Sequence, residues 1–386
     1  MSLRRIGFLG LALGAFGAAA LAVCGVAAEP EPKPAGEMRN ARLRDLPDNT
    51  WVKVGPFKGK EKGASEVNWC YDPDGRRLVR FGGCTSTYSN ECWSFDLGTE
   101  TWTQNLRYAR DAQDPKRCPS DRPGYGCNRG IGYDRENQCF WVFGGASSDT
   151  SPGWTTGLWK GVGDLGVGKW THLKSVPSGE AARVQYDETA RKVVCIFKDM
   201  GSWGQTWTYD PKTDKAVQGD ADPSGAKEGR AGGGGFPGFV YVPELKGCLY
   251  VAGMPTKLKK EGGPEMTTWL FDAATGKWKD LAPQGPGPSR RSGMGLAYDS
   301  KSRVVVLYGG GGGSATPPDD TWAYDPARNA WTDLKPETSP GKFYKKSPNG
   351  VSEAQMMAYD QEHNVHVLVL QNWQVDNAVW AYRYKK

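Results

Sequence analysis

The chain has 386 residues, 49 of them basic and 43 acidic, with a net charge of +6, nine cysteines and only three histidines. The charge is small for this length and is mixed along the chain, which argues against a nucleic-acid-binding protein. The length alone would allow two domains. However, aromatic residues form 11% of the chain and recur at regular intervals, which indicates one repeated unit.

Residues 1–28 have the pattern of an export signal. Arg4 and Arg5 form a basic start, an apolar stretch runs from Ile6 to Val26, and small residues follow for cleavage. We therefore expect a secreted or periplasmic protein with no membrane span after cleavage. A retained anchor is the alternative, and the arginine pair leaves open whether export follows the general or the twin-arginine route. Residues 29–48, rich in proline and charge, predict a spacer.

From residue 49 onward the chain repeats one pattern six times. Each copy opens with a tyrosine, usually before an aspartate, continues with an apolar strand, and then carries two tryptophans on either side of an aromatic-Asp pair. The opening tyrosines are Tyr71, Tyr133, Tyr186, Tyr241, Tyr298 and Tyr359. The first tryptophans are Trp93, Trp159, Trp207, Trp269, Trp322 and Trp380, and the second are Trp102, Trp170, Trp278 and Trp331. Short apolar segments bounded by turn residues predict β-strands.

These residues resemble the kelch repeat, whose period is about 50 residues and whose unit is one four-stranded propeller blade. The resemblance covers nearly all of residues 50–386. It implies an all-β fold, a six-bladed kelch-type β-propeller like the central domain of galactose oxidase, over residues 49–386. In each blade, strands a to d run from the axis outward. The repeated tryptophans are expected to fill the wedges between blades.

The sixth copy lacks its outermost strand, because the chain ends soon after Trp380. The segment Asn49–Val54 has the composition of that missing strand, with Trp51 in the place of the second tryptophan. We therefore predict that this N-terminal strand completes the last blade. Such closure would hide strand edges that an open ring would expose.

Cysteine usage fits an oxidising compartment. Cys84 and Cys92 flank the b–c loop of the first blade, and Cys118 and Cys127 bracket part of the next long loop. We predict disulfides in these two loops, each worth roughly 2–3 kcal/mol if unstrained. The sequence cannot fix the connectivity. Three further cysteines fall in predicted b strands and are interpreted as buried thiols: Cys139, Cys195 and Cys248.

Residues suited to catalysis are scarce. The three histidines, His172, His363 and His366, are not spaced as metal ligands on one strand face, and no cofactor or metal is predicted. Copper oxidases of the galactose-oxidase type use two histidines, two tyrosines and a tyrosine–cysteine crosslink, which have no counterpart cluster here. Neither a Gly-x-Ser-x-Gly elbow nor a P-loop is present.

The candidate site lies on the face that the b–c and d–a loops build. The b–c loops carry tryptophans outside the repeat pattern, namely Trp154, Trp203 and Trp373. On the d–a side, polar residues precede or begin the inner strands, namely Asn68, Arg129, Arg183, Arg291 and Gln355. An aromatic rim with arginines suits sugar rings, carboxylates or an extended peptide. The alternative for the tryptophans is packing onto their own loops.

Two functions are compatible with this pattern. The first is an exported, monomeric binding module that recognises a protein, peptide or glycan through the b–c/d–a loop face. The alternative is a carbohydrate-active enzyme like the six-bladed kelch sialic-acid mutarotase, acting in the same pocket. That resemblance is one of architecture, and fold does not settle function. A deep funnel with an arginine beside a buried carboxylate or histidine would favour the enzyme, while a broad, shallow face would favour the binding module.

Overall fold

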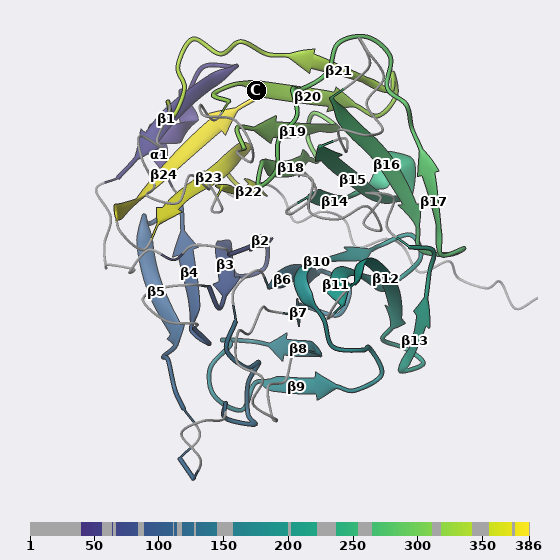
Figure 1. Ribbon diagram of the computed structural model, residues 1–386. Helices are drawn as coiled ribbons and strands as arrows, with labels where there is room; N and C mark the ends of the chain where they lie inside the picture. Colours follow the sequence, from purple (N-terminus) through teal and green to yellow (C-terminus); the bar gives the residue numbers. More distant parts are fainter. Residues whose placement is uncertain are drawn as a thin grey trace, which may run out of the picture. The chain divides into compact units, whose positions relative to one another are not determined.

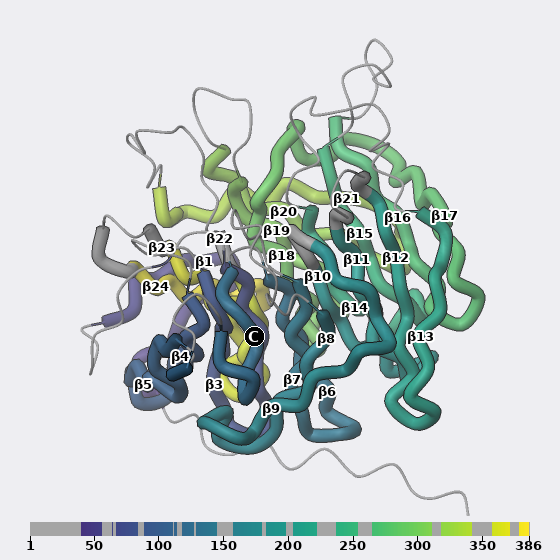
Figure 2. The backbone as a smooth tube through the Cα atoms, turned by 60° about the horizontal axis from the view of Figure 1, so that its bottom comes forward, coloured from purple at the N-terminus to yellow at the C-terminus, as the bar shows by residue number. Residues whose placement is uncertain are grey.

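The protein is an all-β, six-bladed propeller (Figure 1). The computed structural model describes residues 40–55, 64, 67–83, 89–110, 112–113, 118–126, 129–144, 157–199, 202–221, 237–253, 265–310, 318–341, 355–372 and 375–385, except for the side chains of residues 180–182, 198–199, 202–203, 355–356, 371–372 and 375–377. Six four-stranded antiparallel sheets stand around one axis, and Figure 2 shows their strands side by side around the ring.

In the first five blades the four strands pair in chain order. Blade 1 contains β2 (Trp69–Asp72), β3 (Arg77–Phe81), β4 (Cys92–Asp96) and β5 (Thr101–Leu106). Blade 2 contains β6 (Gly130–Asp134), β7 (Cys139–Phe143), β8 (Leu158–Val162) and β9 (Trp170–Leu173). Blade 3 contains β10 (Glu180–Asp187), β11 (Lys192–Asp199), β12 (Ser202–Asp210) and β13 (Lys215–Gln218).

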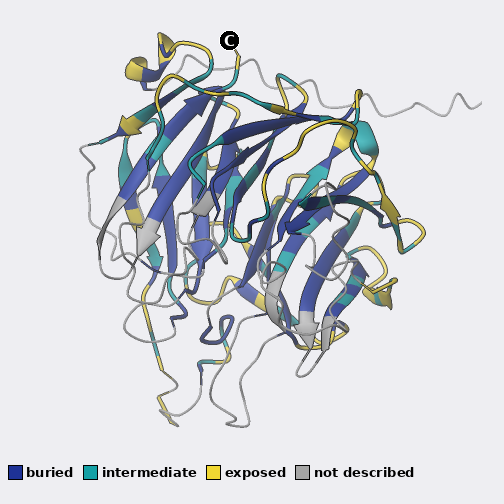
Figure 3. Ribbon diagram, turned by 45° about the horizontal axis from the view of Figure 1, so that its top comes forward, coloured by how far each residue is buried: buried dark blue, intermediate teal, exposed yellow. Residues whose placement is uncertain are grey.

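The next two blades follow the same plan. Blade 4 contains β14 (Gly238–Val242), β15 (Gly247–Gly253), β16 (Met266–Asp272) and β17 (Lys277–Asp280), with the short 3-10 helix η2 (Pro243–Leu245) between its first two strands. Blade 5 contains β18 (Gly295–Asp299), β19 (Val304–Tyr308), β20 (Thr321–Asp325) and β21 (Ala330–Asp333). Buried residues concentrate in the strands (Figure 3), as expected when sheet faces pack on both neighbours.

Blade 6 joins the two ends of the chain. It contains β22 (Gln355–Asp360), β23 (Val365–Asn372), β24 (Val375–Arg383) and, as its outermost strand, β1 (Thr50–Val54). The β1–β24 ladder runs from Thr50 opposite Arg383 to Val54 opposite Val379. The predicted closure by the N-terminal strand is confirmed.

Trp51 occupies the place of the second tryptophan in blade 6, and its contacts establish the equivalence. Its Nε1 donates to Thr321 Oγ1 of blade 5 at 3.0 Å. In the same way, Nε1 of Trp331 in blade 5 donates to Thr268 of blade 4 at 3.2 Å. Each indole thus buries its apolar body in a wedge and satisfies its N–H on the preceding blade.

The free edge of β1 is also partly covered. The main-chain N–H of Trp51 donates to Thr338 Oγ1 at 3.0 Å, and the Thr338 hydroxyl donates back to the Trp51 carbonyl at 2.7 Å. Thr338 lies in the loop that follows β21. This cover removes one donor and one acceptor from an edge that another chain could otherwise pair with.

The repeated tyrosine and aspartate have distinct roles at the turn between strands a and b. The aspartate accepts main-chain N–H groups of its own turn, as Asp299 does from Lys301 and Ser302 at 2.9 and 2.7 Å. The tyrosine reaches the turn of the preceding blade, as Tyr186 does in donating to Glu136 at 2.7 Å. The motif therefore builds the turn and fixes it to its neighbour.

Residues 40–48, which the sequence pattern placed in the spacer, pack onto the propeller in the structure. They include α1 (Ala41–Arg44), and Leu43 and Leu46 are buried in the cluster that contains Leu97 and Val365. The apolar side chains of this short segment explain the difference, because a solvated spacer would not bury them. No helix in the described part of the chain is long and apolar enough to cross a membrane.

The predicted loop disulfides are not found: Cys92 and Cys118 carry free thiols, and their predicted partners, Cys84 and Cys127, lie outside the described residues. The Cys92 side chain is fully buried in the cluster of Val79 and Phe81, and burial raises its pKa to about 12. Cys118 Sγ instead accepts the main-chain N–H of Tyr125 at 2.9 Å.

The remaining strand cysteines behave as predicted. Cys139, Cys195 and Cys248 are fully buried free thiols.

The repeated tryptophans differ in burial. Trp207, Trp269, Trp278 and Trp380 are half-buried, and the rest are buried.

The indole–threonine contacts can be tested by a matched pair of substitutions. Thr321→Val should lower the free energy of unfolding by about 1–3 kcal/mol, because it leaves the buried Nε1 of Trp51 without an acceptor. Thr206→Val should cost less, since Trp278 Nε1 donates both to Thr206 and to the Asp220 carbonyl, each at 3.2 Å. Urea unfolding of both variants measures the difference. Equal losses would contradict the assigned role of Thr321 in closure.

Candidate functional site

The two ends of the propeller differ in the length of their connections. At one end, here called the turn end, every connection between strands a and b is four residues long, as in 73–76 and 300–303. At the other end, here called the loop end, four b–c loops have ten residues or more, and the longest d–a loops are 107–129 and 334–354. Long and unequal loops on a rigid scaffold are where binding residues usually lie.

Half of the predicted site residues fall where their side chains are not described. Trp154 and Trp373 lie outside the described residues, and Trp203 and Gln355 lie in β12 and β22 with side chains that are not described. Trp203 is therefore in a strand rather than in a loop, because the β11–β12 hairpin continues to Asp199 opposite Ser202. The ligand-binding role of these four residues stays a prediction.

Asn68 and Arg183 connect the innermost strands of neighbouring blades. Asn68 Nδ2 donates to the Arg129 carbonyl at the start of blade 2. Arg183 Nε donates to the Pro237 carbonyl before β14 at 3.0 Å. Burial lowers the pKa of Arg183 to about 10, while the nearby Tyr250 acts in the opposite sense. These side chains thus stabilise the inner ring of strands at the loop end.

Arg129 supports a loop. It is 1% exposed, and its Nη2 donates to the carbonyls of Gly124 and Tyr125 at 2.7 Å each. Its guanidinium also lies over the Phe81 ring, 6.0 Å from the centroid. The contacts hold residues 124 and 125 of the loop that follows β5 against blade 1.

Arg291 forms the most extensive polar network at this end. Its fully buried guanidinium donates to both oxygens of Asp320, to the Gly309 carbonyl, and to the carbonyl and hydroxyl of Ser289. Trp322 Nε1 donates to the same carboxylate at 2.9 Å. Burial would raise the pKa of Asp320, but the contacts with Arg291 outweigh it and lower that pKa. This is an arginine beside a carboxylate, but all donors of the arginine are used internally.

Sequence reasoning missed an aromatic pair at the loop end. Tyr108 and Tyr125 stack with ring centroids 5.4 Å apart and an interplanar angle of 22°, and Arg110 Nε donates to the Tyr108 hydroxyl at 3.1 Å. Tyr108 is 38% exposed. Both tyrosines lie in a d–a loop and outside the repeat pattern. They therefore carry the same sequence signal as the b–c tryptophans, an aromatic residue in a loop with no role in the repeat.

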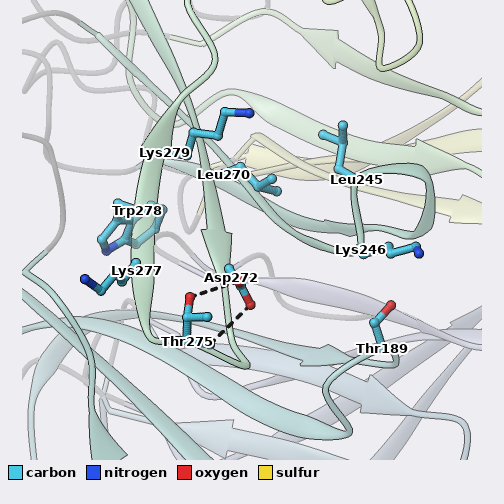
Figure 4. A pocket seen from close by; sticks show the side chains of 9 residues that line it. All are labelled: Thr189, Leu245, Lys246, Leu270, Asp272, Thr275, Lys277, Trp278 and Lys279. Atoms are coloured by element: carbon cyan, nitrogen blue, oxygen red, sulfur yellow. Dashed lines mark hydrogen bonds between the residues drawn. The ribbon is translucent and has the colours of Figure 1, made fainter.

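A groove with a volume of about 420 Å³ lies at the turn end of blade 4 (Figure 4). Leu245 and Leu270 line it, and the Thr275 hydroxyl donates to Asp272 Oδ2 at 2.8 Å. The other lining residues are Thr189, Lys246, Lys277, Trp278 and Lys279. Lys277 and Lys279 are also the charged residues of an outermost strand, where lysines discourage edge pairing.

The described residues contain no group of three or more metal-ligating side chains placed to hold an ion.

Asp187, two residues before Thr189 of this groove, is a buried acid. It is fully buried, Oδ1 accepts the Ala190 N–H at 2.8 Å, and Oδ2 has no hydrogen-bond partner in the described structure. Burial raises the pKa of Asp187 to about 6, partly offset by the turn N–H groups and reinforced by Asp272 and Glu188. The ionised form is therefore costly in the folded protein.

Comparison with known proteins finds no family model and no curated protein that matches this chain.

The buried arginine network predicts a large effect on stability. Asp320→Ala should destabilise the protein by about 3–5 kcal/mol, because it leaves the buried Arg291 charge without its counter-ion. Thermal or urea unfolding measures the loss. A change below about 1 kcal/mol would mean that solvent reaches the guanidinium, which would then be available to a ligand.

Asp187 predicts a stability that depends on pH. Because its folded pKa lies above the unfolded value, its contribution to stability is present at low pH and is lost as pH rises toward 6. Asp187→Asn should therefore stabilise the protein by about 2–3 kcal/mol at pH 8 and by much less near pH 4. Urea unfolding at both pH values gives the comparison.

The equivalent turn residue of blade 2 is the matched control for that prediction. Asp134 is also fully buried, but its Oδ2 accepts hydrogen bonds from Trp141 Nε1 at 3.0 Å and Asn137 Nδ2 at 2.7 Å. Asp134→Asn should be destabilising at both pH values, since it turns an NH₂ toward a donor. Destabilisation of the Asp187 variant at pH 8 would show that its carboxylate has a partner.

Proposed function

We propose that this protein is an exported kelch-type propeller that acts as a binding module for a protein, peptide or glycan at its loop end. The observation that carries the proposal is the contrast between the uniform four-residue a–b turns and the long, unequal loops at the opposite end. A scaffold whose longest and most unequal connections lie at one end is suited to recognition there.

The kelch assignment is supported by the role of each repeated residue. The tyrosine bonds to the preceding blade, the aspartate organises the turn, and the second tryptophan fills the wedge between blades. These contacts explain why the pattern recurs at this spacing. The proposal of export rests on residues 1–28 alone, which lie outside the described part of the chain.

Internal contacts cover the turn end of blades 6, 1 and 2, which favours the loop end for a ligand. Arg135 of blade 2 donates to Gln361 of blade 6 at 2.9 Å, although blade 1 lies between them in the ring. Asn40, the first described residue, also packs at the turn end, against the Leu97 carbonyl and His363. Asn40 therefore lies on the side away from the long loops.

The proposal is tested by binding and stability measured on the same variants. The mature protein is screened on glycan and peptide arrays, and Trp154→Ala, Trp203→Ala and Trp373→Ala are compared for the ligand that binds. Each of these three substitutions that affects the site should weaken binding by roughly 1–2 kcal/mol with an unchanged melting temperature. Trp322→Ala, at a repeat position, should destabilise the fold by roughly 3–5 kcal/mol.

Replacing the loop 144–157 by a short Gly-Ser connection provides the decisive control. Loss of binding with a retained fold supports recognition at the loop end. Full binding by this variant and by all three tryptophan variants would place the site elsewhere. Conversion of a sugar anomer by the purified protein would favour the mutarotase alternative over a binding module.

A further inference from the structure

The N-terminal residues 40–46, here called the clasp, lie across two blades at the turn end. Asn40 Nδ2 donates to the Leu97 carbonyl and to Glu100 of blade 1, at 3.0 Å each. The main-chain N–H of Asn40 donates to His363 Nε2 of blade 6 at 3.2 Å. One residue therefore connects the first and last blades.

The hydrogen bonds of His363 define its protonation state. A main-chain N–H can only donate, so Nε2 must be the unprotonated acceptor. The proton then resides on Nδ1, which donates to Asp360 Oδ2 at 2.8 Å. Both side chains are at most 1% exposed. The clasp is thus bound by a neutral imidazole of one tautomer.

Arg383 provides the second attachment of the clasp. It is 1% exposed and donates through Nη2 to the carbonyls of Leu43 and His363, at 2.7 and 3.0 Å. Nη1 donates to the carbonyls of Leu46 and Arg44, at 2.7 and 3.2 Å. Since arginine stays charged at all relevant pH values, this attachment does not change with acid.

The charges around His363 come from several elements. In its own turn, Asp360 holds Nδ1, and Glu362 Oε1 lies 3.9 Å from Nε2. Arg76 of blade 1 lies 4.0 Å from Glu362, and Arg383 of β24 contacts the His363 carbonyl. From the clasp and the blade beside it, Arg42 pairs with Glu100. A proton added at Nε2 would therefore find Glu362 as an alternative partner.

We propose that His363 is an acid-sensitive latch for the clasp. Protonation of Nε2 places an N–H against the N–H of Asn40, which removes their hydrogen bond and turns the imidazolium toward Glu362. The contact between Asn40 and blade 6 is lost, and the clasp opens from its N-terminal end toward Arg383. The ladder of β1 with β24 is separate from this contact, so the ring stays closed.

Hydrogen–deuterium exchange of the full chain tests the latch. Exchange is corrected for the intrinsic effect of pH and compared at about pH 7.5 and pH 5.5, the range in which histidines ordinarily change charge. Peptides that cover residues 40–46 should lose protection by about tenfold at the lower pH, as expected when a buried hydrogen bond is broken. Peptides from β1 should keep their protection.

Two variants separate the latch from a general effect of acid. His363→Gln keeps an acceptor and a donor but cannot become charged, so its clasp should show equal protection at both pH values. His172→Gln, in β9 of blade 2, should respond to acid like the unchanged protein. Acid-induced loss of protection in the His363→Gln variant, or its absence in the unchanged protein, would overturn the proposal.

A direct reading of the tautomer keeps the test independent of how the variant folds. Nitrogen-15 NMR of the unchanged protein at about pH 7.5 should show His363 with its proton on Nδ1. A proton on Nε2 under these conditions is incompatible with acceptance from Asn40 and would refute the latch.

Discussion

The ladder between β1 and β24 is the constraint on which the rest of the ring depends. Each blade packs both sheet faces on its neighbours, so an incomplete sixth blade would leave two wedges and a strand edge exposed. The N-terminal strand removes that problem, with Trp51 donating to Thr321 of blade 5, as Trp331 and Trp278 donate to threonines of the blades before them. Chain ends separated by more than 300 residues thus form one sheet, and this pairing couples all six blades.

Contacts between neighbouring a–b turns add a second ring of connections, and these alternate around the axis. At the interfaces of blades 2 with 3 and 4 with 5, a tyrosine and an arginine of one blade both bond to a glutamate of the preceding one. Arg76 and Glu362 form an ion pair at 4.0 Å between blades 6 and 1. Arginine–glutamate pairs between a–b turns therefore lie at alternate interfaces of the ring.

Internal hydrogen bonds fix the inner strands at the loop end, while the loops beside them differ in length from blade to blade. Asn68, Arg183 and Arg291 were expected to face a ligand, but their described hydrogen bonds go to carbonyls and a carboxylate of the protein itself. Polar side chains beside the axis are expensive to bury unless they are paired, so the fold uses them for its own stability. The loops, such as the one that carries the exposed Tyr108 and its neighbour Arg110, take no part in the wedge contacts and can change without disturbing them.

The sequence by itself determined the number of blades, the order of their strands and the closing strand. It did so because each repeated residue makes one defined contact: aspartate and tyrosine at the a–b turn, and tryptophan in the wedge between blades. Only the tertiary structure decided what the residues at the loop end do. Whether Arg291 meets a ligand or Asp320 depends on which loop packs beside it, and no periodicity encodes that. Likewise, the short loop between Cys84 and Cys92 would allow a disulfide. However, Cys92 lies on the strand face that packs into the core, where it is a buried thiol. The latch of His363 combines segments 323 residues apart, which local patterns cannot reveal.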